Sequence, residues 1–188
     1  MNRRQTLRHD KTRLPRIWLM TDLRLGDDLL PAIKRLRCGS GVIFRHYDLA
    51  APDRKALFGR VRRLCRQRGH ILLLAGDQRT AQRWHADGYH ARADARRSKH
   101  MVHSAPVHNR RELTQARRFG ADMILLSPVF ATASHPGARP LGRTAFMALA
   151  EQCTGMAAIA LGGMTQRSAA TLDKRRIHGW AAIDAFKL

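Results

Sequence analysis

The sequence predicts an α/β fold, a compact (βα)8 TIM barrel that ends without the helix after its last strand. Three observations predict it: eight short β-like runs alternate with amphipathic helical stretches, several of these runs are apolar throughout, and no linker interrupts the alternation. Strands that are apolar on both faces are typical of a parallel sheet covered by helices. Eight strand–helix units in 188 residues give a barrel below the usual size. An open doubly wound sheet is the structural alternative.

The eight predicted strands are short apolar runs, most of which end near a polar residue or a glycine. ILLLAG and MILLSPV are apolar on both faces, so these two runs are expected to be covered by helices. In chain order the predicted strands are Ile17–Asp22, Gly41–His46, Ile71–Gly76, Gly88–Ala91, Met101–Ala105, Met123–Val129, Ala157–Gly163 and Gly179–Phe186.

The clearest predicted helix is Asp53–Gln67. Within it, Leu57, Val61, Leu64 and Cys65 recur at three- and four-residue spacing, which places them on one buried face. Arginines occupy its other faces, where we expect them to be solvated. The helices predicted between the strands are Asp27–Leu36, Asp53–Gln67, Gln78–His85, Arg110–Phe119, Arg143–Gln152 and Gln166–Lys174.

The composition is strongly basic, with 35 Lys and Arg against 14 Asp and Glu and a net charge of +21 at pH 7. Such an excess attracts polyanions, so phosphorylated small molecules and nucleic acids are both candidate partners. Aromatic residues make up only 6%, and no stacking motif for bases accompanies the arginines. Nucleic-acid binding is therefore the less favoured alternative.

The sequence carries no feature of membrane insertion or secretion. No apolar run is long enough to cross a membrane, and the basic segment 1–14 leads into no secretory apolar stretch. Cys38, Cys65 and Cys153 form no closely spaced pair, which predicts free thiols in a reducing compartment. We therefore expect a cytoplasmic protein with a basic N-terminal arm over 1–14 and one barrel domain over 15–188.

Functional groups of a (βα)8 barrel gather at the C-terminal ends of its strands. Gly162 and Gly163 directly follow one strand and lead into a helix, where backbone amides can approach a phosphate, although an ordinary tight turn has the same sequence. The long segment Pro128–Gly142 is either a binding loop or a simple connection. Polar residues at the predicted strand ends are Thr21, Asp22, Arg45, His46, Tyr47, Asp77, His90, His103, Ser104, His108, Ser127, Thr132, Ser134, His135 and Asp184.

Five segments carry a resemblance to a known family, in the right order and over almost the whole chain from Ile17. They are IWLMTD, GVIFRHYD, ADGYHA, VHNRRELTQARRFGADMILLSPVFAT and AIALGGM, of which the last two are the most specific. Together they resemble the thiamine phosphate synthase / thiazole tautomerase (TenI-like) family of (βα)8 barrels. The resemblance implies a role in thiamine biosynthesis and a phosphorylated thiazole as ligand.

Two activities follow from the resemblance. A synthase joins a pyrimidine diphosphate to a thiazole phosphate with Mg2+, whereas a tautomerase aromatises a thiazole carboxylate phosphate and needs no metal. The resemblance implies that His108 is the catalytic acid or base. It assigns substrate and phosphate binding to Arg45, His46, Thr132, His135, Gly162 and Gly163. Asp77 and Asp94 are the implied Mg2+ ligands of a synthase-like site.

Departures from the synthase pattern favour the tautomerase. His46 and Tyr47 stand where the synthase has Glu-Lys, His135 stands where it has Lys, and Asp77 and Asp94 are each one residue out of register. A proton shift needs a group that titrates near neutral pH, and histidine is such a group. The replaced residues equally allow a catalytically degenerate protein that binds a phosphorylated ligand or acts as a regulator. A homodimer would cover the surface exposed by the missing last helix.

Overall fold

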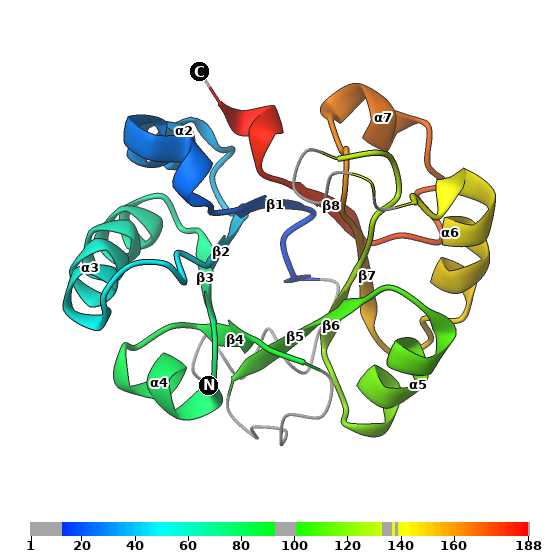
Figure 1. Cartoon of the computed structure of the whole chain (residues 1–188), viewed down its shortest axis with the longest axis horizontal. Coiled ribbons are helices and arrows are strands. Elements are labelled where there is room, and N and C mark those ends of the chain that lie inside the picture. Colours follow the sequence, from blue (N-terminus) through cyan, green and yellow to red (C-terminus); the bar gives the residue numbers. More distant parts are fainter. Residues whose placement is uncertain (1–12, 93–100, 133–136, 138, 188) are drawn as a thin grey trace.

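The protein is a closed barrel of eight parallel strands that follow one another in sequence order, which confirms the predicted fold (Figure 1). The computed structural model describes residues 13–92, 101–132, 137 and 139–187. The strands are β1 (Ile17–Met20), β2 (Gly41–Phe44), β3 (Ile71–Ala75), β4 (Gly88–His90), β5 (Val102–Val107), β6 (Met123–Leu126), β7 (Ala157–Ala160) and β8 (Gly179–Ala182). Pairing of β1 with β8 closes the ring.

Helices surround the ring of strands and form the outer layer (Figure 1). Among the described residues they are η2 (Leu23–Asp28), α2 (Leu29–Arg35), α3 (Ala51–Gln67), α4 (Gln78–Arg83), α5 (Arg110–Arg118), α6 (Gly142–Glu151), α7 (Gln166–Ala170) and η3 (Asp184–Phe186). The first predicted helix begins earlier than expected, because the 3-10 segment η2 precedes α2 and bends at Gly26.

Most predicted strands are longer than the observed ones at their C-terminal ends. The eighth was predicted to reach Phe186, but β8 ends at Ala182 and the chain turns at Ile183, whose backbone is helical, into η3. Polar and glycine residues that end the predicted strands, such as Arg45 and Gly162, lie in the loops just beyond the ladder. These loops form the mouth of the barrel.

The two faces of each strand pack against different partners. Phe44 of β2 makes an edge-on ring contact with Phe58 of α3, so its face of β2 is the outer one. Gly41 lies on the opposite face, because side chains alternate along a strand. An added Cβ at Gly41 would lie 2.1 Å from the Trp18 ring. Trp18, which is fully buried, therefore fills the barrel interior beside Gly41.

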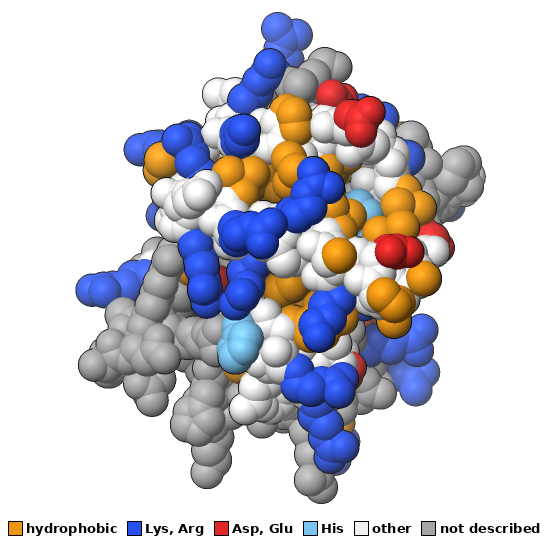
Figure 2. Space-filling model, turned by 90° about the vertical axis from the view of Figure 1, so that its left-hand side faces the viewer, with side chains coloured by type: hydrophobic (Ala, Val, Ile, Leu, Met, Phe, Trp, Pro, Cys, Tyr) orange, Lys and Arg blue, Asp and Glu red, His pale blue; other side chains and the backbone are white. Residues whose placement is uncertain are grey.

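Helix α3 buries the face that the spacing predicts, except that Phe58 takes the buried position expected for Leu57. Phe58, Val61, Leu64 and Cys65 are its buried residues, whereas Leu57 is only partly buried. Lys and Arg side chains are spread over the side of the barrel where α2 and α3 lie, with few acidic groups among them (Figure 2). The arginines of α3 thus lie mostly on the outer surface of the molecule.

Residues 1–12 of the predicted arm lie outside the described residues. Leu14 is buried, and its carbonyl accepts a hydrogen bond from His178 Nε2 at 2.6 Å, so the chain already packs on the barrel there. The three cysteines are free thiols. No helix among the described residues is long and apolar enough to span a membrane.

Candidate functional site

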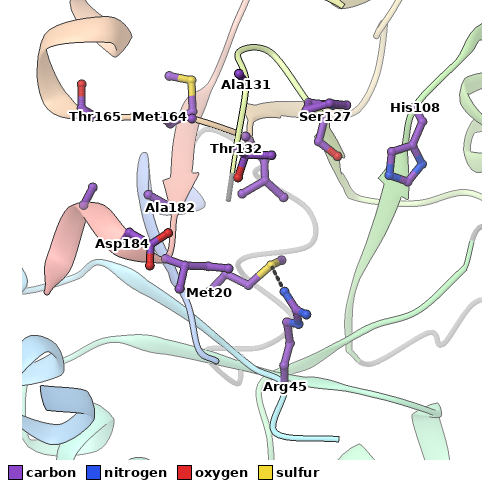
Figure 3. Close-up of a pocket in the computed structure, with 16 residues that line it drawn as sticks. Met20, Arg45, His108, Ser127, Ala131, Thr132, Met164, Thr165, Ala182 and Asp184 are labelled. Atoms are coloured by element: carbon purple, nitrogen blue, oxygen red, sulfur yellow. Dashed lines mark hydrogen bonds between the residues drawn. The ribbon is translucent and has the colours of Figure 1, made fainter. Parts of the chain in front are cut away.

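A pocket of about 420 Å³ opens at the C-terminal ends of the strands (Figure 3). The ends of β1, β2, β5, β6, β7 and β8 and the loops after them form its wall. Its lining residues are Met20, Arg45, His108, Ser127, Pro128, Ala131, Thr132, Leu161, Gly162, Gly163, Met164, Thr165, Ala182, Ile183, Asp184 and Ala185.

The pocket brings together most of the described residues that the sequence assigned to the site. Arg45, His108, Thr132, Gly162 and Gly163 all line it, although they come from four different strand ends. Two described residues of the predicted set, His46 and Asp77, do not line it. The other two, His135 and Asp94, lie outside the described residues.

Strand alternation explains why Arg45 lines the pocket. It follows β2 on the face of Gly41, which is the inner one, so its side chain points into the barrel mouth. Its guanidinium lies 3.4 Å from Met20 Sδ and 3.6 Å from Asp22 Oδ2. Arg45 therefore supplies a cationic group at the pocket wall, held by one carboxylate.

Arg54 of α3 supports the segment that carries Arg45. Its Nε donates to the Arg45 carbonyl at 2.9 Å and its Nη2 donates to the Ala75 carbonyl at 2.6 Å. The guanidinium also lies over the rings of Tyr47 and Trp84, at 5.3 and 5.7 Å from their centroids. One helix residue thus fixes the ends of β2 and β3 to each other and to α3.

The histidines at two other strand ends make contacts within the protein. His46 is buried outside the pocket, with its ring stacked on Phe44 and its Nδ1 2.9 Å from Thr21 Oγ1. Burial lowers the pKa of His46. His90 Nδ1 lies 3.0 Å from Ser104 Oγ, and burial lowers the pKa of His90 to about 3. Both rings are therefore neutral at pH 7.

His108 lies on the pocket wall after β5 and is paired with Glu112 of α5. The Glu112 Oε2 accepts hydrogen bonds from the His108 backbone N–H at 2.7 Å and from the ring Nδ1 at 2.9 Å. Burial acts to raise the pKa of Glu112, but these hydrogen bonds outweigh it and hold that pKa below its ordinary value. Because an ionised carboxylate only accepts, Nδ1 carries the proton. In the neutral form of the ring, the lone pair is therefore on Nε2.

Gly162 and Gly163 form a turn that no other residue fits well. Their φ angles are 94° and 60°, and a Cβ on Gly163 would lie 2.5 Å from the carbonyl oxygen of Ala131. The turn is joined to the loop after β6, because Phe130 N–H donates to the Gly162 carbonyl at 3.1 Å. Neither glycine amide donates to another described residue. These amides are therefore available to an anion in the pocket.

Replacing Gly163 by Ala should lower the free energy of unfolding by about 2 kcal/mol or more, because left-handed strain and the contact with Ala131 add. Gly155→Ala is the matched control. Gly155 has a similar φ of 76° but open space around its Cβ, so only the strain of about 1 kcal/mol remains. Urea unfolding of both variants measures the difference. Equal losses of unfolding free energy in the two variants would show that the contact with Ala131 does not contribute to stability.

The sequence model of the thiamine monophosphate synthase family matches residues 21–186. The chain belongs to this family. The match covers every strand end that lines the pocket except Met20, and it confirms the family resemblance of the sequence motifs. Membership of the thiamine monophosphate synthase family supports a role in thiamine biosynthesis.

Two curated relatives and one solved structure agree with this. The putative thiamine-phosphate synthase 2 of Aquifex aeolicus (strain VF5) is 28% identical over 183 residues, covering 92% of this chain and 98% of that protein. The thiamine-phosphate synthase of Chloroflexus aurantiacus is 28% identical over 182 residues, covering 90% of this chain and 84% of that protein. The thiamine phosphate pyrophosphorylase from Pyrococcus furiosus shares the fold, with a TM-score of 0.75 at 19% identity, covering 93% of this chain and 88% of that one.

The described residues form no cluster of ligands for the Mg2+ that the resemblance implies for a synthase-like site. Asp77, one of the two implied ligands, is the N-cap of α4, and its Oδ1 accepts a hydrogen bond from the Thr80 amide at 2.9 Å. That hydrogen bond lowers the pKa of Asp77. Within the described ranges, no three His, Cys, Asp or Glu side chains come together as metal ligands. Asp94, the second implied ligand, lies outside these ranges.

Several pocket residues of this family member were not singled out from the sequence. Met20 and Ala182 read as ordinary strand residues, and without the register between neighbouring strands the sequence does not show that they face the pocket. Thr165 caps α7 in a reciprocal pair with Ser168, a spacing that the sequence does show. Ser127 and Asp184 stood among the polar strand ends, but nothing in the sequence ranked them above the others.

Proposed function

We propose that this member of the thiamine monophosphate synthase family is a thiazole tautomerase-like enzyme that binds a phosphorylated thiazole and moves a proton with His108. The observation that carries the proposal is the pairing of His108 with Glu112 at the wall of the pocket. A histidine with one nitrogen held by a carboxylate has its other nitrogen prepared for proton transfer.

The placement of charges in the pocket supports this substrate class. A thiazole carboxylate phosphate has an anionic group at each end of a small ring. Figure 3 shows Thr165 and Met164, which follow the glycine turn, at one end of the pocket and Arg45 at another, with His108 on a third side. The glycine amides suit the phosphate and the guanidinium suits the carboxylate. The reacting ring then lies between them.

The reaction requires no change in oxidation state. His108 Nε2 accepts a proton from a ring carbon and returns one at the other end of the shifted double bond, so substrate and product are isomers. The Glu112 carboxylate stabilises the imidazolium that forms between the two transfers, and it keeps the ring in one tautomer. Arg45 would hold the carboxylate of the substrate throughout.

The names of the relatives favour thiamine phosphate synthesis as the second candidate. That reaction displaces diphosphate, a group that carboxylate-bound Mg2+ and cations must hold. The position of Asp77 as a helix cap weighs against it. A degenerate protein that only binds the phosphorylated ligand is the third candidate.

One experiment on the wild-type protein separates the three candidates. The protein is given thiazole carboxylate phosphate in D2O with EDTA, and ring aromatisation and proton exchange are followed by NMR. In parallel it is given pyrimidine diphosphate, thiazole phosphate and Mg2+. We expect EDTA-insensitive aromatisation and no thiamine phosphate. Formation of thiamine phosphate without aromatisation would support the synthase, and binding without any turnover would support the degenerate protein.

A further inference from the structure

An acidic side chain lies at the end of the pocket where the proposed function places a phosphate. Asp184 is the first residue of η3, separated from the end of β8 by Ile183, and it lines the pocket together with Gly163 and Thr165. Figure 3 shows Asp184 and Thr165 on one side of the pocket and His108 on the opposite side. The carboxylate is 45% exposed, so it can meet a ligand without leaving its position.

The cations around Asp184 are already engaged with acids. Asp184 Oδ2 lies 3.2 Å from Arg24 Nη1, and Oδ1 lies 3.7 Å from Lys187 Nζ. Arg24 also binds Asp22 at 3.0 Å, and Asp22 in turn lies 3.6 Å from Arg45. Positively and negatively charged side chains therefore alternate along the rim of the pocket from the end of β2 to η3. A phosphate at this end would have to share these cations with Asp184.

A carboxylate and a phosphate dianion repel each other, whereas a carboxylate accepts a hydrogen bond from a hydroxyl. The exposed ion pairs of Asp184 screen this repulsion only in part. The ligand group that suits this end best is therefore one that offers an O–H to Asp184 while it accepts from the glycine amides. A terminal alcohol does both.

We propose that Asp184 is a specificity-determining residue that weakens binding of the phosphate dianion and accepts the hydroxyl of the corresponding alcohol, so that the pocket takes both forms of its thiazole ligand. This inference rests on the proposed thiazole site and extends its ligand class from the phosphate ester to the free alcohol. Asp184 acts here on the affinity ratio of the two forms, with no part in the proton transfer.

Asp184→Asn tests the inference by calorimetric titration at pH 8 and low salt, where a phosphate ester is a dianion. The probes are a hydroxyalkyl thiazole, its phosphate ester and inorganic phosphate. The variant should bind the ester and inorganic phosphate about tenfold more tightly than the wild type, because the repulsion is gone and Arg24 is released to the anion. It should bind the alcohol about threefold or more weakly, because an accepting carboxylate oxygen is lost.

Two further variants make the result specific. Glu151→Gln removes the same charge from α6, where Glu151 pairs with Arg176 outside this pocket, and it should leave all three affinities unchanged. Asp184→Ser replaces the carboxylate with a smaller, uncharged side chain and should reproduce the gain in phosphate affinity. Unchanged or weaker binding of the ester by both Asp184 variants would overturn the inference, as would the absence of binding of all three probes to every protein.

Failure of this inference differs from failure of the proposed function. If the affinity ratio shifts as expected but the wild type does not aromatise thiazole carboxylate phosphate, the tautomerase proposal fails and the role of Asp184 stands. If the wild type turns over and the Asp184 variants bind the ester no better, only the role of Asp184 fails.

Discussion

Replacing His108 by Asn should lower the rate of tautomerisation about 10²- to 10⁴-fold, the usual contribution of a positioned acid or base. The Asn side chain keeps one hydrogen-bond donor for Glu112 but has no group that exchanges a proton near neutral pH. Ligand affinity should stay within about threefold, because an exposed His108 contributes little to binding the uncharged ring. Steady-state turnover and calorimetric affinity, measured on the same protein, separate the two effects.

Two other substitutions sharpen this result. Glu112→Gln removes the carboxylate that holds His108 Nδ1 and should cost about tenfold in rate with a shifted pH profile, because the ring loses both its orientation and its stabilised cation. His85→Asn is the matched control, since His85 is exposed outside the pocket and its φ of 59° is one that Asn tolerates. A His108 variant that turns over like the His85 variant would exclude His108 as the catalytic group.

The largest effect on stability is expected from Trp18→Ala, which should lower the free energy of unfolding by about 3–5 kcal/mol. The Trp18 ring is fully buried in the barrel interior, and its Nε1 donates to the Pro15 carbonyl at 2.7 Å. Gly41 beside it has no side chain that could move into the space. The substitution therefore leaves a cavity and an unpaired carbonyl.

Urea unfolding followed by circular dichroism measures this loss, and Trp180→Ala is the control. Trp180 is only partly buried on the outer face of β8, where it stacks on Phe186, so its removal should cost about half as much. A Trp18 variant no less stable than the Trp180 variant would contradict the interior packing described for Gly41 and Trp18.

The strand bodies could be predicted because burial on both faces leaves a direct mark in the sequence. ILLLA and MILL are apolar at every position, and both are fully buried strands. Strand ends were less predictable. In GWAAIDAF the apolar pattern continues past Ala182, which predicts a longer strand. The helical backbone of Ile183 ends the strand instead, and the side chains give no sign of this turn.

The candidate site could be predicted where a residue type or a motif stands at a strand end, as with Arg45, His108 and Gly163. It could not be predicted where the role depends on a contact between distant segments. Arg54 belongs to a run of helix arginines, and only the fold brings its guanidinium to the Arg45 carbonyl. Asp184 becomes notable only because the barrel places it on the same side of the pocket as Thr165, opposite His108.

The pairing of β1 with β8 has a consequence for how the protein is made. Leu19 and Ala182 are register partners, although they come from opposite ends of the described chain. During synthesis β1 leaves the ribosome first, and its outer edge has no partner until the last strand emerges. Any sheet that β1 has formed by then with the strands after it has a bare edge. During synthesis the ring therefore cannot close before β8 has emerged, and nascent chains are expected to need protection from aggregation until then.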